Sequence, residues 1–476
     1  MKPRRGGVSV VGRAPPAAMA GAVAVAHNKA MVAHPSDSDL PPFTPTFASA
    51  LWYWLRLGCI SFGGPAGQIA IMHRELVEQR RWISEARFLH ALNYCMLLPG
   101  PEAQQLATYI GWLLHRTRGG IAAGVLFILP SWFVLVALSW AYMRYAELPL
   151  LAAVLAGLKP AVVALVLHAA YRIGARTLRN AWLWSIAIAA FIALVLSHLP
   201  FPLVIATAAL LGVLGGRVAP ASFMLAAHAP SKPHADRAVI DDHSPRLTHT
   251  HYRLPRLLLV IASGLVLWAL PLGILAWRFG WSASPTQMAW FFTRAALLTF
   301  GGAYAVLPYV YQGAVVHFGW LNNAQMMDGL ALGESTPGPL IMVVTFVGFV
   351  GGWQHGPWAP LDFSGALLGA AVTTWFTFLP SFVFILAGGP VIESTRDTLK
   401  FTAPLTAITA AVVGVIASLA VFFAAHALWP AGHFNGLAMT LAALAFIALQ
   451  GWRISVLWVL GASALIYPAL QLLHLL

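Results

Sequence analysis

The sequence predicts an all-α polytopic membrane protein with two inverted-topology repeats that contain broken or re-entrant helices. Three observations support this fold class. Of the 476 residues, 59% are hydrophobic and 9% are charged, whereas charged residues make up about a quarter of an ordinary soluble domain. A motif in the first half recurs in the second half at a fixed offset. The Lys and Arg residues lie in short groups between apolar runs, which is typical of membrane proteins.

Two stretches carry the repeat. Residues 56–65 read RLGCISFGGP and residues 294–303 read RAALLTFGGA, so an arginine precedes a Phe-Gly-Gly turn in both. The offset from Arg56 to Arg294 is 238 residues, and two further landmarks keep it: Trp82 with Trp320, and Pro99-Gly100-Pro101 with Pro337-Gly338-Pro339. One offset across three landmarks indicates two copies of one unit, and we expect function where the copies meet.

Composition and motifs exclude several classes of protein. The net charge of +13 does not indicate a nucleic-acid partner, because the basic residues are not gathered on a soluble face. Both cysteines, Cys59 and Cys95, lie in apolar segments, so no disulfide framework is expected. The sequence contains no P-loop, HExxH, CxxC or GxSxG motif. We therefore expect no catalytic residues, no metal site and no cofactor.

The chain begins with residues 1–45, a basic segment rich in Ala, Gly and Pro, for which we predict a disordered cytoplasmic tail. The first repeat, residues 46–216, opens with short apolar segments on either side of Phe62-Gly63-Gly64-Pro65 and of Pro99-Gly100-Pro101. None reaches the roughly 20 residues that a spanning helix needs, so broken or re-entrant helices are predicted. Full spans are expected at 120–143, 148–171, 180–197 and 201–216.

A polar linker, residues 217–256, separates the halves. Its histidines are metal-ligand candidates, but a flexible polar loop is the favoured interpretation. The second repeat with its preceding span occupies residues 257–476 and follows the same plan. Short pairs surround its Phe-Gly-Gly and Pro-Gly-Pro motifs, and full spans are expected at 257–279, 362–388, 402–427, 435–450 and 453–473.

The basic residues predict the topology. If each broken pair returns to the side it entered from, only Arg144 and Arg278 fall in outer loops. The second-half segments 310–326 and 351–361 contain no Lys or Arg, unlike their first-half counterparts. The four full spans of the first repeat plus span 257–279 make an odd number, which inverts the second copy and leaves the tail and linker cytoplasmic. The alternative is that the short segments cross the membrane fully, with residues 74–87 outside.

Three basic residues lie inside apolar segments: Arg56, Arg294 and Lys159. A charge at membrane depth costs several kcal/mol unless it is paired or hydrated, which marks a functional candidate. The structural alternative is an arginine that snorkels from a helix end. Two guanidinium groups from the two copies suit a small tetrahedral oxyanion, because each can bond two oxygens.

The glycine turns fit the same ligand. Gly63-Gly64 and Gly301-Gly302 allow close backbone approach, and a half-helix that begins at Pro65 or Ala303 would direct its free N–H groups at the turn. Tight helix packing by small residues is the alternative. Gln68 adds a donor near the first turn.

Glu102 and Glu334 lie next to the two Pro-Gly-Pro loops and are candidates for coupling a proton, together with Lys159; capping of a half-helix is an equal alternative. The two glutamates are not at equivalent repeat positions, so coupling is expected to be asymmetric. His90 and Asp328 share one repeat position and receive no predicted role.

FGGP at 62–65, HRELVEQRRWISEARF at 73–88, LLPGPEAQQLATYIG at 97–111 and STPGPL at 335–340 resemble the chromate ion transporter (CHR) family in its long, two-domain form. The second Phe-Gly-Gly and the pairs Pro130-Ser131 and Pro380-Ser381 fit as well. The resemblance implies export of chromate across the bacterial inner membrane, driven by the membrane potential or a proton gradient, and hence chromate resistance. Signature positions carry over to Phe62, Gly63, Gly64, Pro65, Pro99, Gly100, Pro101, Phe300, Gly301, Gly302, Pro337, Gly338 and Pro339.

The second copy departs from the pattern at Ala303 and lacks the basic stretch at 73–88, so equal contact of both halves with substrate is not implied. A carrier of sulfate or another oxyanion is the main alternative, and a membrane-bound chromate-reducing enzyme is disfavoured because no cofactor site is recognisable. The choice between uniport and proton antiport stays open, and no oligomeric state is predicted.

Overall fold

A computed structural model describes residues 44–62, 64–197, 199–223, 238–241, 248–358, 362–394 and 402–472. Within these ranges every regular element is helical, apart from one isolated bridge between Ile83 and Ile240, which confirms the all-α fold class. Nearly all of the predicted tail, much of the linker and the predicted site residue Gly63 lie outside the described residues.

Six helices in the described ranges are long and apolar enough to cross a membrane. This confirms a polytopic membrane protein. The six are α4 (Glu102–Tyr145), α5 (Pro149–Thr177), α7 (Phe201–Val218), α8 (Leu254–Phe279), α13 (Phe363–Ser394) and α14 (Thr402–Leu428). Shorter apolar helices are α6 (Ala181–Val195), α12 (Val343–His355), α15 (Gly436–Gln450) and α16 (Val456–Leu472).

The Phe-Gly-Gly and Pro-Gly-Pro motifs interrupt helices in both halves, as predicted. The first half runs α1 (Phe47–Ile60), α2 (Gly64–His73), a π-helical turn η1 (Arg74–Gln79) and α3 (Glu85–Leu97). The second half runs α9 (Ser284–Leu298), α10 (Ala303–Tyr311), a π-helical turn η4 (Gln312–His317), α11 (Asn323–Ser335) and a short 3-10 turn η5 (Leu340–Met342). The elements η1 and α3 correspond to η4 and α11 at the offset of 238 residues.

The break predicted before residue 120 lies inside α4. The short segment after Pro101 and the span predicted at 120–143 form two helical arms that meet at His115 and Arg116, whose backbone angles are not helical. Arg116 has a φ of 57°. The two arms fold back on each other, because a Cβ on Gly124 would lie 2.4 Å from Thr108 Oγ1, so the predicted break is present.

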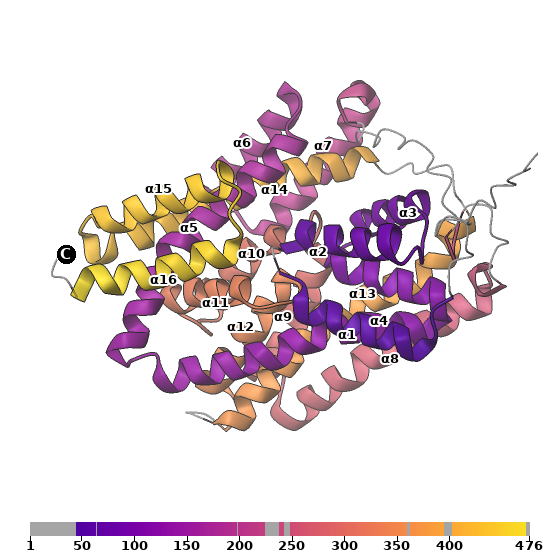
Figure 1. Ribbon diagram of the computed structural model, residues 1–476, viewed down its shortest axis with the longest axis horizontal. Helices are drawn as coiled ribbons and strands as arrows, with labels where there is room; N and C mark the ends of the chain where they lie inside the picture. Colours follow the sequence, from indigo (N-terminus) through magenta and orange to yellow (C-terminus); the bar gives the residue numbers. More distant parts are fainter. Residues whose placement is uncertain are drawn as a thin grey trace, which may run out of the picture. The chain divides into compact units, whose positions relative to one another are not determined.

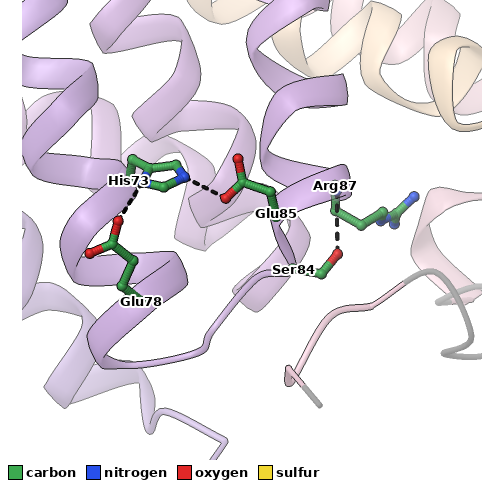
Figure 2. Close-up of polar contacts among 5 residues, drawn as sticks. All are labelled: His73, Glu78, Ser84, Glu85 and Arg87. Carbon is green, nitrogen blue, oxygen red and sulfur yellow. Dashed lines mark hydrogen bonds and ion pairs between the residues drawn. The ribbon is translucent and has the colours of Figure 1, made fainter. Parts of the chain in front are cut away.

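Local sequence explains where the helices begin. Ser84 caps α3 by accepting a hydrogen bond from the N–H of Arg87, as Figure 2 shows. Asn322 stands at the equivalent position before α11 and forms a capping box with Gln325. The two halves therefore start equivalent helices with different capping side chains.

The helices differ in how much of their surface is covered by other helices. Helix α14 packs against α5, α6 and α7, and α15 and α16 pack against α5 (Figure 1). Helix α1 lies alongside α4. Helix α8 is mostly exposed, with Leu259 69% and Trp277 85% accessible, as expected for a helix whose apolar side chains face lipid.

Candidate functional site

The Phe-Gly-Gly turn of each half is hydrogen-bonded to the Pro-Gly-Pro loop of the other half. The backbone N–H of Gly100 donates to the carbonyl oxygen of Thr299, and the N–H of Gly338 donates to that of Ser61, each with an N–O distance of 2.7 Å. Thr299 and Gly338 follow Ser61 and Gly100 by the same 238 residues, so one contact is made twice with the halves exchanged. We call these four residues the crossing. Reciprocal contacts of this kind are expected where two copies of a unit meet around a local two-fold axis.

Glycine is required at two positions of the crossing. Gly100 and Gly338 have φ values of 129° and 109°, which side chains rarely adopt. A Cβ on Gly100 would lie 2.3 Å from Ser381 Oγ, and one on Gly338 would lie 2.5 Å from Ser131 Cβ. Ser131 and Ser381 each follow a proline inside a long helix, α4 and α13. The close approach is therefore also repeated in the two halves.

Half-helices begin beside the crossing with their first turns uncapped by side chains. Gly64, the first residue of α2, has a φ of 71°, and Gly302, the N-cap of α10, has a φ of 96°. Neither Gly302 nor Pro101, the N-cap of α4, makes a side-chain capping bond. The first N–H groups and the positive dipole ends of α4 and α10 are therefore suited to an anion.

Two buried glutamines hold the loops in place. The amide of Gln68 donates to the carbonyl of Gly338 at 2.5 Å and to that of Ser61 at 3.4 Å. The amide of Gln105 donates to the carbonyl of Pro99 at 2.8 Å and to Ser381 Oγ at 3.4 Å. Four buried atoms around the crossing have no hydrogen-bond partner among the described residues: Ser61 Oγ, Gln68 Oε1, Gln105 Oε1 and Ser131 Oγ. Such orphaned groups are rare in folded proteins and typical of ligand sites.

Both predicted acidic residues lie close to the second Phe-Gly-Gly turn. Glu102 is the first residue of α4, and its Oε1 lies 3.8 Å from the place where a Cβ of Gly302 would be. Its carboxylate thus stands between the N-termini of α4 and α10. Glu334 is buried near the end of α11 and accepts a hydrogen bond from the hydroxyl of Tyr304.

Comparison with known proteins decides the family. The sequence profile of the family described as chromate transporter matches residues 48–213 and again residues 286–467. The chain belongs to the chromate transporter family. The two matched regions each contain one Phe-Gly-Gly turn and one Pro-Gly-Pro loop, so each region contributes half of the crossing.

Curated relatives support the same family. The chain is 33% identical to a chromate transport protein of Pseudomonas aeruginosa over 76% of its own length and 77% of the relative. It is 30% identical to a chromate transport protein of Cupriavidus metallidurans over 80% and 83% of the two chains. A probable chromate transport protein of Synechococcus elongatus is also 30% identical, over 78% and 82%. No solved structure matches the chain significantly.

In this member of the chromate transporter family, the two predicted arginines contact residues outside the crossing. The Arg56 side chain is 52% exposed and lies 4.0 Å from Glu75 Oε1. The guanidinium of Arg294, which is exposed, lies 5.8 Å from the ring centre of Trp290. Their convergence on one ligand stays a prediction.

The remaining predicted residues lie in the turns and loops described above. The N–H of Phe62 donates to Ile60 and that of Phe300 donates to Leu298, each at 3.0 Å, so the two turns are alike. Lys159, half-buried on α5, interacts electrostatically with Asp328 on α11. The others belong to the same turns and loops: Pro65, Pro99, Gly301, Pro337 and Pro339.

Sequence reasoning missed several polar residues near the crossing. Ser61 and Thr299 contribute through backbone carbonyl groups, which no side-chain pattern reveals. Ser131 and Ser381 stand out in the sequence only as part of repeated Pro-Ser pairs. That repetition was the available signal, because a polar residue after a proline in both long helices is unusual in apolar sequence.

Proposed function

We propose that this protein exports chromate from the cytoplasm across the inner membrane, and that the crossing and the half-helix ends beside it bind the anion. The observation that carries the proposal is the reciprocal pair of hydrogen bonds from Gly100 and Gly338. It joins the signature motifs of both halves at one place. The substrate is inferred from relatives that are named chromate transport proteins.

The chemistry of the crossing suits a tetrahedral dianion. The unpaired hydroxyls of Ser61 and Ser131 can donate hydrogen bonds, and the N-terminal N–H groups of α4 and α10 can donate more. We further propose that Arg56 and Arg294 converge on the anion, where each guanidinium can bond two of its oxygens. Glu102 occupies the space between two helix N-termini, so its carboxylate would compete with the anion unless it is protonated or moves.

The direction of transport follows from charge. A dianion that leaves a negative interior gains about 4.6 kcal/mol per 100 mV, at about 2.3 kcal/mol per charge. The membrane potential thus favours export without ATP. A proton gradient is the second proposed driving force, with Glu102, Glu334 and Lys159 as coupling residues.

The proposed topology is that of inverted repeats with the N-terminal tail and the central linker in the cytoplasm. Its support is the excess of Lys and Arg in the first-half segments between residues 74 and 118, compared with none in 310–326 and 351–361.

Flux measurements test the proposal. Inside-out membrane vesicles with the protein should accumulate radiolabelled chromate when a potential, positive inside the vesicle, is imposed, and vesicles without it should not. Accumulation of sulfate but not chromate would mean that the transported anion is sulfate. Production of reduced chromium by the purified protein would instead indicate the reducing enzyme.

A further inference from the structure

Helix α11 carries two buried carboxyl groups, and the mechanism above uses only one of them. Asp328 is 4% exposed and Glu334 is 8% exposed. Their separation of six positions corresponds to about 9 Å along a helix. Glu334 is next to the crossing, whereas Asp328 lies nearly two turns earlier on α11.

Groups from two other helices face Asp328. The hydroxyl of Tyr142, near the end of α4, donates to Asp328 Oδ2 at 3.0 Å. Lys159 on α5 is close enough to interact electrostatically with the carboxyl group, without a direct ion pair within 4.0 Å. The second oxygen, Oδ1, is buried and has no hydrogen-bond partner in the described part of the chain.

The other helices packed against α11 add no competing charge at this point. The titratable residues of α12 and α16 are His355 and Tyr467, and neither interacts with Asp328. On α11 itself the next carboxyl group is Glu334, which has its own hydroxyl donor, Tyr304 from α10, and an electrostatic partner, Arg172 from α5. Each acid on α11 is thus faced by one tyrosine and one cation.

This arrangement suits a group that alternates between two protonation states. The carboxylate is stabilised by the hydroxyl of Tyr142 and by the charge of Lys159, whereas burial favours the neutral acid. The orphaned Oδ1 provides a position for the incoming proton. A permanently charged structural group would be expected to have both oxygens bonded and a direct cation partner.

The position also connects to the crossing. Helix α11 ends at Ser335 with Thr336 as its C-cap, and the chain then enters Pro337 and Gly338, whose N–H bonds to Ser61. Helix α11 therefore connects the surroundings of Asp328 on α4 and α5 directly to the loop of the crossing. The equivalent residue in the first half is His90, so the two halves differ here.

We propose that Asp328 is a proton-binding site that couples inward proton movement to outward movement of the anion. The inference rests on the proposed function. The carboxylate of Asp328 takes up one proton from water on one side, forms a neutral carboxylic acid and releases the same proton on the other side. One proton enters for each cycle of the site, and no electrons are transferred.

The test uses the full-length protein in liposomes, with the membrane potential clamped. A pH gradient of about one unit supplies about a tenfold driving force per proton, so wild type should accumulate chromate accordingly. Exchange of chromate without any gradient is measured in parallel. Asp328→Asn should lose the response to the pH gradient but retain exchange, and Asp328→Glu should keep both. The control is Asp362→Asn, which preserves a helix cap near Gly365 and should behave as wild type.

The outcomes separate the two proposals. Wild type without chromate exchange would overturn the proposed function. If wild type exchanges chromate and Asp328→Asn keeps the full pH response, the inference about Asp328 is wrong. Loss of both activities in correctly folded Asp328→Asn and Asp328→Glu would also overturn it, in favour of a structural role.

A second variant covers failure of Asp328→Asn to fold. Tyr142→Phe removes one hydrogen bond to the carboxylate while keeping the ring on Phe346. The midpoint of the pH profile of transport should then shift upwards by about one unit, because the charged form loses a donor. An unchanged midpoint would contradict the role of Asp328.

Discussion

Each half makes a side-chain hydrogen bond at equivalent positions, but the two bonds join different residue types. In the first half His73 Nε2 lies 2.5 Å from Glu85 Oε2, and Glu78 lies 3.2 Å from the other ring nitrogen (Figure 2). At the equivalent positions of the second half, the hydroxyl of Tyr311 donates to Asn323 Oδ1 at 3.0 Å. The helices joined are the same, but the first-half bond is ionisable and the second-half bond is neutral.

The buried carboxyl groups differ in the opposite sense, because they lie on α11 of the second half and not on α3. Helix α11 contains buried Asp328 and Glu334, whereas the equivalent first-half positions are His90 and Met96. The backbone of the crossing is nevertheless shared by both halves. On the proposed function, the shared backbone would bind the anion, and the unshared ionisable groups would set the orientation and the coupling.

The largest effect is expected from the shared glycines. Gly100→Ala and Gly338→Ala should each reduce chromate transport by about tenfold or more, because the left-handed backbone alone costs about 1–2 kcal/mol and the added Cβ meets Ser381 or Ser131. Transport per molecule of membrane-inserted protein is the measurement. Gly461→Ala in α16, where no atom lies within 4 Å of the added Cβ, is the matched control. Tolerance of either substitution would break the equivalence of the halves.

A buried ion pair between the halves should have the next largest effect. Arg87 Nη1 lies 2.7 Å from Glu393 Oε2, and the hydroxyl of Tyr109 donates to Glu393 Oε1 at 2.5 Å. The position equivalent to Arg87 is Gln325, so the second half lacks the arginine of this pair. Glu393→Gln should destabilise the protein by about 3 kcal/mol, because it leaves a buried guanidinium unpaired.

Thermal unfolding in detergent measures this loss. The double variant Arg87→Met with Glu393→Met should recover much of the stability, because no buried charge is left. A double variant no more stable than Glu393→Gln would contradict this account.

Linker contacts should depend on pH. His249 Nε2 lies 3.1 Å from the carbonyl oxygen of Trp112, and burial lowers the pKa of His249 from its usual value of 6.5. The folded linker therefore favours the neutral ring, and its docking is fully stable above about pH 6.5 and weakens as the pH falls towards the lowered pKa.

Hydrogen exchange of residues 248–253 should accordingly quicken between pH 7.5 and pH 5.5, after correction for the intrinsic rate. In His249→Gln this extra pH dependence should disappear. Its persistence in the variant would assign the effect to another group.

The smallest effect concerns one backbone position. Arg81 has a φ of 51°, and its equivalent, Gly319, has a φ of 63°. The same turn is thus made by arginine in one half and glycine in the other. Arg81→Gly should stabilise the protein by about 0.5 kcal/mol, because relief of about 1–2 kcal/mol of strain exceeds the entropy cost of glycine. Gly319→Ala should destabilise it. A loss of stability in Arg81→Gly would mean that the contacts of the Arg81 side chain outweigh the strain.

Sequence sufficed for the fold class and for the positions of the helix breaks, because Gly and Pro at 62–65 and 99–101 have strong local effects on the backbone. It also sufficed for the family. The break before residue 120 was predicted from the apolar segments, and the structure places it at His115 and Arg116.

The crossing is formed by backbone groups that are far apart in the chain. Such backbone contacts produce no pattern of side chains in the sequence. Asp328 was recognisable as an acid in apolar sequence, but its partners Tyr142 and Lys159 come from other helices. Its role therefore emerged only from tertiary contacts. The convergence of Arg56 and Arg294 stays a prediction.

The central claim is that chromate binds where the two halves meet. Anomalous scattering from chromium in crystals of the protein grown with chromate tests it most directly, because the signal of chromium jumps across its absorption edge and that of sulfur does not. The account predicts one strong peak within hydrogen-bond distance of the first turns of α4 or α10 and close to Ser61 or Ser131. A peak at another place in an ordered protein, with the crossing empty, would contradict it.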